Sequence, residues 1–145
     1  MELKTTDLRI GNRFNIKTRF GETELVTVWG ISNYNSGHII DEDYSAFGLD
    51  ELIPITITEK QIVKLGFEKV ENPNNIKLLD GLFHKNRNYN YDEVRFYKNG
   101  RIDFRIGSYK KANAIYKNDK RPKYVHQLQN LYFALTGSEL VFSEA

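Results

Sequence analysis

The segment from His84 to Tyr124 combines positive charge with tyrosine rings, which are side chains that neutralise phosphates and stack on bases. Residues 84–124 carry 12 Lys and Arg against 4 Asp and Glu, a net charge of +8 in a chain whose total is +2. The tyrosines of the segment are Tyr89, Tyr91, Tyr97, Tyr109, Tyr116 and Tyr124. The pattern predicts a basic, Tyr-rich face that contacts nucleic acid or a phosphorylated nucleotide.

The predicted contact residues lie in or beside the charged turns of this segment. They are Tyr97, Arg101, Lys110, Lys111, Lys117, Lys120, Arg121 and Lys123. Two alternatives stay open, because tyrosine is common on outer sheet faces and because Arg95 and Arg105 have acidic neighbours in the predicted hairpin. In the first alternative, the segment forms a basic face that contacts only solvent. In the second, it binds an acidic host protein. Residues 1–83 carry 9 Lys and Arg against 13 Asp and Glu, so the charge is strongly asymmetric.

A second candidate contact patch lies in "YVHQLQNLYFALTGSEL", residues 124–140. At about 100° per residue of a helix, the apolar side chains of this stretch fall on one core-facing arc. That arc contains Tyr124, Val125, Leu128, Leu131, Tyr132 and Leu135. The adjacent arc holds His126, Gln129 and Phe133, which we therefore expect beside the buried stripe. Phe133 is either covered by the C-terminal tail or the basic loops, or exposed as a contact, and we expect it to be covered.

Other chemistry has little support in the sequence. The chain has no cysteine, and its histidines, His38, His84 and His126, lack the spacing of metal ligands. The acidic run Asp41 to Asp43 lacks the spaced oxygens of a calcium loop, so we expect a solvated strand end or loop. No Gly-rich phosphate loop occurs. We therefore expect a non-enzymatic binding module with no cofactor and no metal.

The sequence pattern of strands and helices that must position these residues predicts an α+β fold. In residues 1–57, short apolar runs separated by turn signals predict a small antiparallel, SH3-like barrel or a curled sheet. Residues 58–145 are expected to form a second subdomain with a short helix, an antiparallel sheet and a closing helix at about 123–136. We expect the two subdomains to make one compact unit. The sequence leaves the oligomeric state open.

Local signals fix several details of the second subdomain. Thr58 with Gln61 fits a capping box, and Gly66 fits the end of a short helix. Asp80-Gly81 is expected to form a turn between two strands. A last strand is expected near Tyr109 and Ile115.

The stretch "VRFYKNGRIDFRI" predicts a hairpin with two possible registers. A two-residue Asn-Gly loop would place Phe96 opposite Asp103 and mix apolar with charged residues on each face. A three-residue loop ending at Gly100 pairs Phe96 with Ile102 instead and leaves one face apolar. The hydrophobic pattern favours the three-residue loop with a bulge.

Three stretches together carry a family resemblance: "LRIGN", "PITITEKQIVKLGFEK" and "YVHQLQNLYFALTGSEL". In this order they resemble small uncharacterised proteins of Bacteroidota and their phages and mobile elements. The resemblance implies a compact accessory protein and supplies no catalytic residue. It also suggests a protein–protein inhibitor, such as an antagonist of a host defence system. No apolar run approaches the roughly 20 residues of a membrane span, so we expect a cytoplasmic protein.

Overall fold

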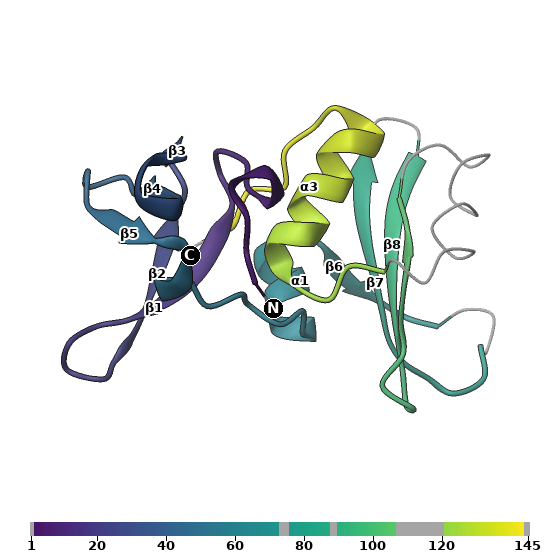
Figure 1. Cartoon of the computed structure of the whole chain (residues 1–145). Coiled ribbons are helices and arrows are strands. Elements are labelled where there is room, and N and C mark those ends of the chain that lie inside the picture. The colour runs from purple at the N-terminus through teal and green to yellow at the C-terminus, as the bar shows by residue number, and fades with distance from the viewer. Residues whose placement is uncertain (1, 73–75, 88–89, 107–120, 144–145) are drawn as a thin grey trace. The chain divides into compact units, whose positions relative to one another are not determined.

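The computed structural model describes residues 2–72, 76–87, 90–106 and 121–143. Within these residues, three antiparallel sheets and two α-helices make up an α+β fold, as predicted (Figure 1). The chain divides into two compact units. Unit 1 contains Met1–Thr56 and Lys123–Leu131, and unit 2 contains Ile57–Pro122 and Tyr132–Ala145. The start of the closing helix therefore belongs to unit 1 and its end to unit 2.

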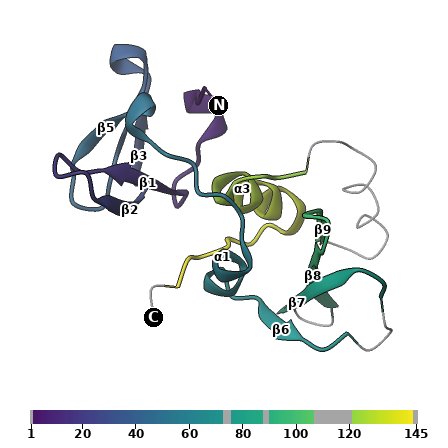
Figure 2. The same cartoon turned by 90° about the horizontal axis from the view of Figure 1, so that it is seen from below.

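Unit 1 is built from short strands and single helical turns. The strands are β1 (Arg13–Lys17), β2 (Thr23–Thr27), β3 (Gly30–Ser32), β4 (His38–Ile40) and β5 (Ala46–Gly48). Three 3₁₀ turns accompany them: η1 (Thr5–Asp7), η2 (Tyr34–Ser36) and η3 (Leu49–Glu51). The hairpin β1-β2 forms one sheet and β3-β4-β5 the other, side by side in both views (Figures 1 and 2). The described residues contain no closed barrel, so only the antiparallel sheets are confirmed, not an SH3-like barrel.

The core of unit 1 is formed by alternate residues of these strands together with the nearby turns. Strand pairing sets Phe14 opposite Val26 and Ile39 opposite Phe47, so their side chains share a face. The buried cluster consists of Leu8, Phe14, Ile16, Val26, Val28, Ile39, Leu49 and Leu52. Burial of this apolar surface stabilises a unit whose strands are too short to be stable alone.

The short helix α1 (Glu59–Lys64) begins and ends where predicted, but only the Thr58 half of the predicted capping box forms, because Gln61 Oε1 has no hydrogen-bond partner among the described residues. Thr58 Oγ1 accepts a hydrogen bond from Gln61 N at 3.4 Å. Gly66 has φ +93°, and the N–H groups of Gly66 and Phe67 donate to the carbonyls of Val63 and Ile62. These two bonds are the Schellman pattern, which satisfies carbonyls that the helix leaves unpaired. Buried Ile62, Leu65 and Phe67 anchor the helix in unit 2.

The sheet of unit 2 has the order β6-β7-β8-β9. Its strands are β6 (Glu68–Val70), β7 (Leu79–Arg87), β8 (Asn90–Tyr97) and β9 (Ile102–Arg105). Phe96 pairs with Ile102 and Val94 with Phe104, which confirms the three-residue hairpin loop. Gly100 has φ +89°, the left-handed conformation that this loop requires at its third position.

The predicted turn at Asp80-Gly81 is wrong, because β7 runs through both residues. Gly81 pairs with Phe96, and the register shifts between Leu79 and Gly81, as in a β-bulge. A Cβ at Gly81 would collide with Glu59 Oε1. The glycine therefore permits the close approach of the Glu59 side chain rather than a chain reversal.

The closing helix α3 (Val125–Thr136) falls within the predicted range. Gly137 has φ +73°, and its N–H donates to Phe133 O at 2.8 Å, which ends the helix as expected. The predicted strand near Tyr109 and Ile115 lies outside the described residues.

Tyr132 of α3 makes a buried polar contact within unit 2. Its hydroxyl donates a 2.5 Å hydrogen bond to Asp92 Oδ2, and both residues are buried. Tyr132→Phe should lower the free energy of unfolding by about 2 kcal/mol, because it removes a donor from a buried carboxylate. Urea unfolding followed by circular dichroism measures the loss.

Two variants control this comparison. Tyr91→Phe removes a hydroxyl from a largely exposed ring and should change the unfolding free energy by less than about 0.5 kcal/mol. Asp92→Asn in the Tyr132→Phe background removes the carboxylate that has lost this donor and should recover part of the loss. Equal unfolding midpoints for Tyr132→Phe and the wild type would contradict the assigned contact.

Candidate functional site

One face of the unit 2 sheet is polar because side chains alternate between the two faces of each strand. Phe83, Val94 and Phe104 are cross-strand partners on the apolar face, and all three are buried. The opposite face carries cationic, acidic and tyrosine side chains, joined by Arg121 from the chain that precedes α3. We name the following set the arginine face: His84, Tyr91, Glu93, Arg95, Tyr97, Arg101, Asp103, Arg105 and Arg121.

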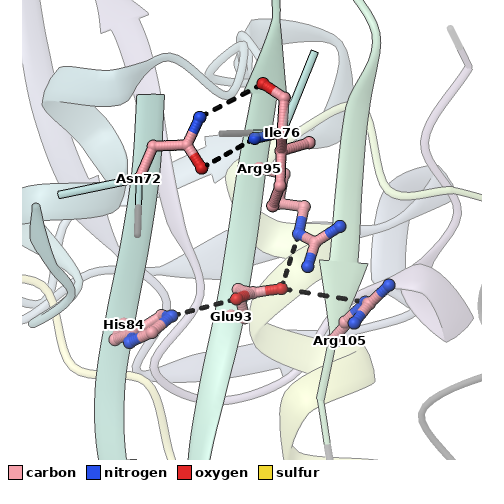
Figure 3. Close-up of polar contacts among 6 residues, drawn as sticks. All are labelled: Asn72, Ile76, His84, Glu93, Arg95 and Arg105. Atoms are coloured by element: carbon pink, nitrogen blue, oxygen red, sulfur yellow. Dashed lines mark hydrogen bonds and ion pairs between the residues drawn. The ribbon is translucent and has the colours of Figure 1, made fainter. Parts of the chain in front are cut away.

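Glu93 on β8 is one centre of the arginine face (Figure 3). Arg95 Nε donates to Glu93 Oε2 at 2.7 Å, and His84 Nε2 lies 2.9 Å from Glu93 Oε1. Arg105 Nε lies 3.7 Å from the same Oε2 atom. Because the Glu93 side chain is only 7% exposed, the two arginines and His84 supply the partners that a buried carboxylate needs.

Asp103 on β9 is the second centre. Its Oδ1 atom accepts a 2.8 Å hydrogen bond from Arg101 Nε and lies 3.4 Å from Arg121 Nη2. The Asp103 side chain is 3% exposed, whereas the Arg101 side chain is 48% exposed. The carboxylates thus lie beneath guanidinium groups that reach the surface, an arrangement that presents positive charge outward.

Tyrosine rings lie among these cations. The rings of Tyr91 and His84 stack with centroids 4.2 Å apart and planes at 25°. The guanidinium carbon of Arg101 lies 5.7 Å from the Tyr97 ring centroid. Burial opposes the charge on Arg95, but a hydrogen bond with Tyr97 and the Glu93 carboxylate outweigh it and raise the pKa of Arg95.

The arginine face therefore has the chemistry of an anion-binding surface. Around Glu93 and Asp103 it holds four arginines, counted among the described residues. Guanidinium groups bind phosphate through several N–H donors, and they retain their charge at any physiological pH. The exposed ring of Tyr91 and the partly buried ring of Tyr97 beside them provide surfaces on which bases stack.

Only some of the predicted contact residues lie together on the arginine face. Tyr97, Arg101 and Arg121 lie on the arginine face, whereas Lys123 is exposed in unit 1. The remaining predicted cations lie outside the described residues: Lys110, Lys111, Lys117 and Lys120.

Sequence reasoning left out Arg95 and Arg105 because each had an acidic partner across the hairpin. The pairing is as predicted, with Arg95 opposite Asp103 and Glu93 opposite Arg105. Yet Arg95 hydrogen-bonds to Glu93 on its own strand. Period-two alternation in "VRFYKNGRIDFRI" was the signal that all these charges share a face.

The predicted contact patch on α3 is wrong for two of its three residues. His126 and Gln129 are each 1% exposed, whereas Phe133 is 38% exposed. The apolar arc predicted the burial of Val125, Leu128 and Tyr132 but missed that polar side chains occupy buried positions beside it. His126 and Gln129 are therefore not accessible to a partner.

Gln129 is buried because it satisfies backbone groups of the N-terminal loop within unit 1. Its Nε2 donates to Gly11 O at 3.1 Å, and its Oε1 accepts from Arg13 N at 3.1 Å. Next to it, Asn130 Oδ1 accepts from Asn12 Nδ2 at 2.8 Å. The stretches "LRIGN" and "HQLQN" thus form one hydrogen-bond network that docks α3, which is a structural role.

The acidic run Asp41 to Asp43 has a local explanation. Asp41 Oδ1 accepts hydrogen bonds from the N–H groups of Asp43 and Ser45, so the side chain stabilises its own turn. In the part of the chain that the structure describes, no group of three or more His, Asp or Glu side chains could hold a metal ion.

Comparison of the chain with protein-family models, with curated proteins and with solved structures gives no significant match. Within the described residues, no helix combines the length and the apolar character needed to cross a membrane. The arginine face is therefore interpreted from its own geometry.

Proposed function

We propose that the protein is a non-enzymatic binding module that contacts nucleic acid or a phosphorylated nucleotide through the arginine face. The observation that carries this proposal is the clustering of four arginines over two buried carboxylates on one sheet face. The carboxylates hold the guanidinium groups in place, so less side-chain entropy is lost when a phosphate binds. The family resemblance adds a phage or mobile-element setting in the cytoplasm.

The test is a binding titration with matched charge variants. Fluorescence anisotropy of labelled oligonucleotides of about 12 nucleotides, single- and double-stranded, is recorded at roughly 50 and 200 mM salt. The double variant Arg101→Gln with Arg105→Gln should bind more weakly. For a single strand, its slope of log K against log salt should be shallower by about 1.4, since each phosphate contact contributes about 0.7.

Lys69→Gln is the matched control. Lys69 is exposed on β6 and pairs with Phe83, so it lies on the opposite face of the same sheet. Its loss should leave the affinity and the salt slope unchanged, and thermal unfolding checks that each variant remains folded. Absence of salt-dependent binding in the wild type would exclude this function.

A second candidate is a protein–protein inhibitor, including an antagonist of a host defence system, that binds an acidic host protein. Exposed large aromatic side chains in unit 1 favour it: Phe20, Trp29, Tyr34 and Tyr44. Aromatic residues are enriched in protein interfaces. A chain that binds none of the oligonucleotides but retains an acidic protein through Arg101 and Arg105 would support this second candidate over the first.

A further inference from the structure

We propose that the ligand of the arginine face is a single-stranded nucleic acid that runs along β8, an inference that rests on the proposed function. Tyr91, Glu93, Arg95 and Tyr97 occupy alternate positions of this strand and belong to the same face. Tyr91 and Tyr97 are six residues apart, so their Cα atoms are separated by about 20 Å at the rise of a β-strand. Arg95 lies between the two rings.

The spacing of the rings selects an extended ligand. A mononucleotide has one base and can stack on only one of the two tyrosines. A single strand can place one base on Tyr91 and a later base on Tyr97, with its phosphates passing the guanidinium groups between them. A duplex keeps its bases stacked inside and offers no base face to either ring.

The state of each ring supports a stacking role. Tyr91 is 54% exposed although one face of its ring packs on His84. That packing, together with the contact between His84 and Glu93, holds the ring in one orientation. Tyr97 is partly buried and carries the Arg101 guanidinium over its ring. Guanidinium planes stack on bases as aromatic rings do, so Arg101 extends the surface at this end of β8.

Arginines in and next to the neighbouring strand β9 lie alongside β8 on the same face of the sheet. Arg105 is the last residue of β9 and Arg101 immediately precedes the strand, with Asp103 between them. Both approach carboxylates of the arginine face through Nε, at 3.7 Å and 2.8 Å respectively. A backbone that passes along β8 therefore meets a cation near each tyrosine. This geometry fits several consecutive phosphates better than the one phosphate group of a nucleotide.

The test compares four probes on the whole chain: a nucleoside triphosphate, oligothymidylates of about 4 and 8 nucleotides, and a duplex of about 12 base pairs. Binding is measured by competition against a labelled single strand at fixed salt. We expect the longer oligothymidylate to bind at least roughly tenfold more tightly than the triphosphate and the duplex. Tyr91→Leu should weaken binding of the single strand by roughly tenfold, whereas Tyr91→Phe should retain it.

Tyr34→Leu, which removes an exposed ring from unit 1, serves as the control and should leave binding unchanged. Equal affinity for the triphosphate or the duplex, or an unaffected Tyr91→Leu variant, would overturn the single-strand inference and leave the proposed function standing. Failure of all four probes to bind would overturn both.

Discussion

Acidification from pH 7 to pH 5 should lower the free energy of unfolding of the protein by about 2 kcal/mol through His126 alone. This side chain is buried, and its ring packs against Phe14 with centroids 4.7 Å apart. The Tyr124 ring lies 6.1 Å away and nearly parallel. Neither ring nitrogen has a hydrogen-bond partner among the described residues.

Burial is the cause of the effect. It lowers the pKa of His126 from 6.5 to about 4, against the weaker opposing influence of the Asp7 carboxylate. The unfolded chain takes up a proton near pH 6.5, but the folded chain takes it up only near pH 4. The full stability is therefore present above pH 6.5, declines as the pH falls, and reaches a total loss of roughly 3 kcal/mol at about pH 4.

Urea unfolding at several pH values, followed by the fluorescence of Trp29, measures this dependence. Trp29 is the single tryptophan of the chain and lies in unit 1. His126→Phe keeps a ring beside Phe14 and removes the titration, so the difference between the two chains should grow as the pH falls from 7 to 5. Parallel profiles for His126→Phe and the wild type would refute the role of His126.

Gly37→Ala should be among the most damaging single substitutions in unit 1, with a loss of about 2–5 kcal/mol. Gly37 has φ +97° and ψ 134°, a conformation that residues with a side chain rarely adopt. Its backbone N–H donates to Tyr34 O, and its carbonyl accepts from Leu49 N, so the chain is held at both sides. A Cβ at this position would lie 2.9 Å from Leu49 Cδ1 and 3.1 Å from Thr5 Cγ2.

The loss expected for Gly37→Ala has two contributions, backbone strain and the collision of the added Cβ, and Gly21→Ala serves as the reference for the first. Gly21 also has a positive φ, +80°, but a Cβ there would have no atom within 4 Å. Its replacement should cost only the backbone strain, about 1 kcal/mol. The excess cost of Gly37→Ala then measures the collision with Leu49, a member of the core cluster, together with any added backbone strain from the ψ of 134° at Gly37. Equal losses for the two variants, in the same urea experiment, would show that the core adjusts without cost.

The features that could be predicted from the sequence are those with local causes. The hairpin register follows from Gly100 and from the alternation of Val94 and Phe96 over a few residues. The ends of α1 follow from Thr58 and Gly66, whose hydrogen bonds reach only three to five residues along the chain. Such signals succeed because turn and cap geometry depends on neighbouring residues.

The failures occur where a distant residue decides the environment. Glutamine is usually found on protein surfaces, but Gln129 is buried because its side chain hydrogen-bonds to backbone groups near Gly11. Gly81 resembles a turn residue, yet the side chain of Glu59 explains its lack of a Cβ. Helical periodicity identifies the strongest apolar arc of α3 but gives no partner for the polar residues beside it.

The candidate site likewise has features that the sequence predicts and features that depend on the tertiary structure. The sequence by itself determined that positive charge and tyrosines concentrate in residues 84–124, and that alternation puts Arg95, Tyr97 and Glu93 on one face. Only the tertiary structure decided that β7 and the chain before α3 bring His84 and Arg121 to that face, around Glu93 and Asp103. The physical reason is that composition and alternation are properties of the chain itself, whereas burial of a carboxylate and the choice of its cations depend on which segments the fold places side by side.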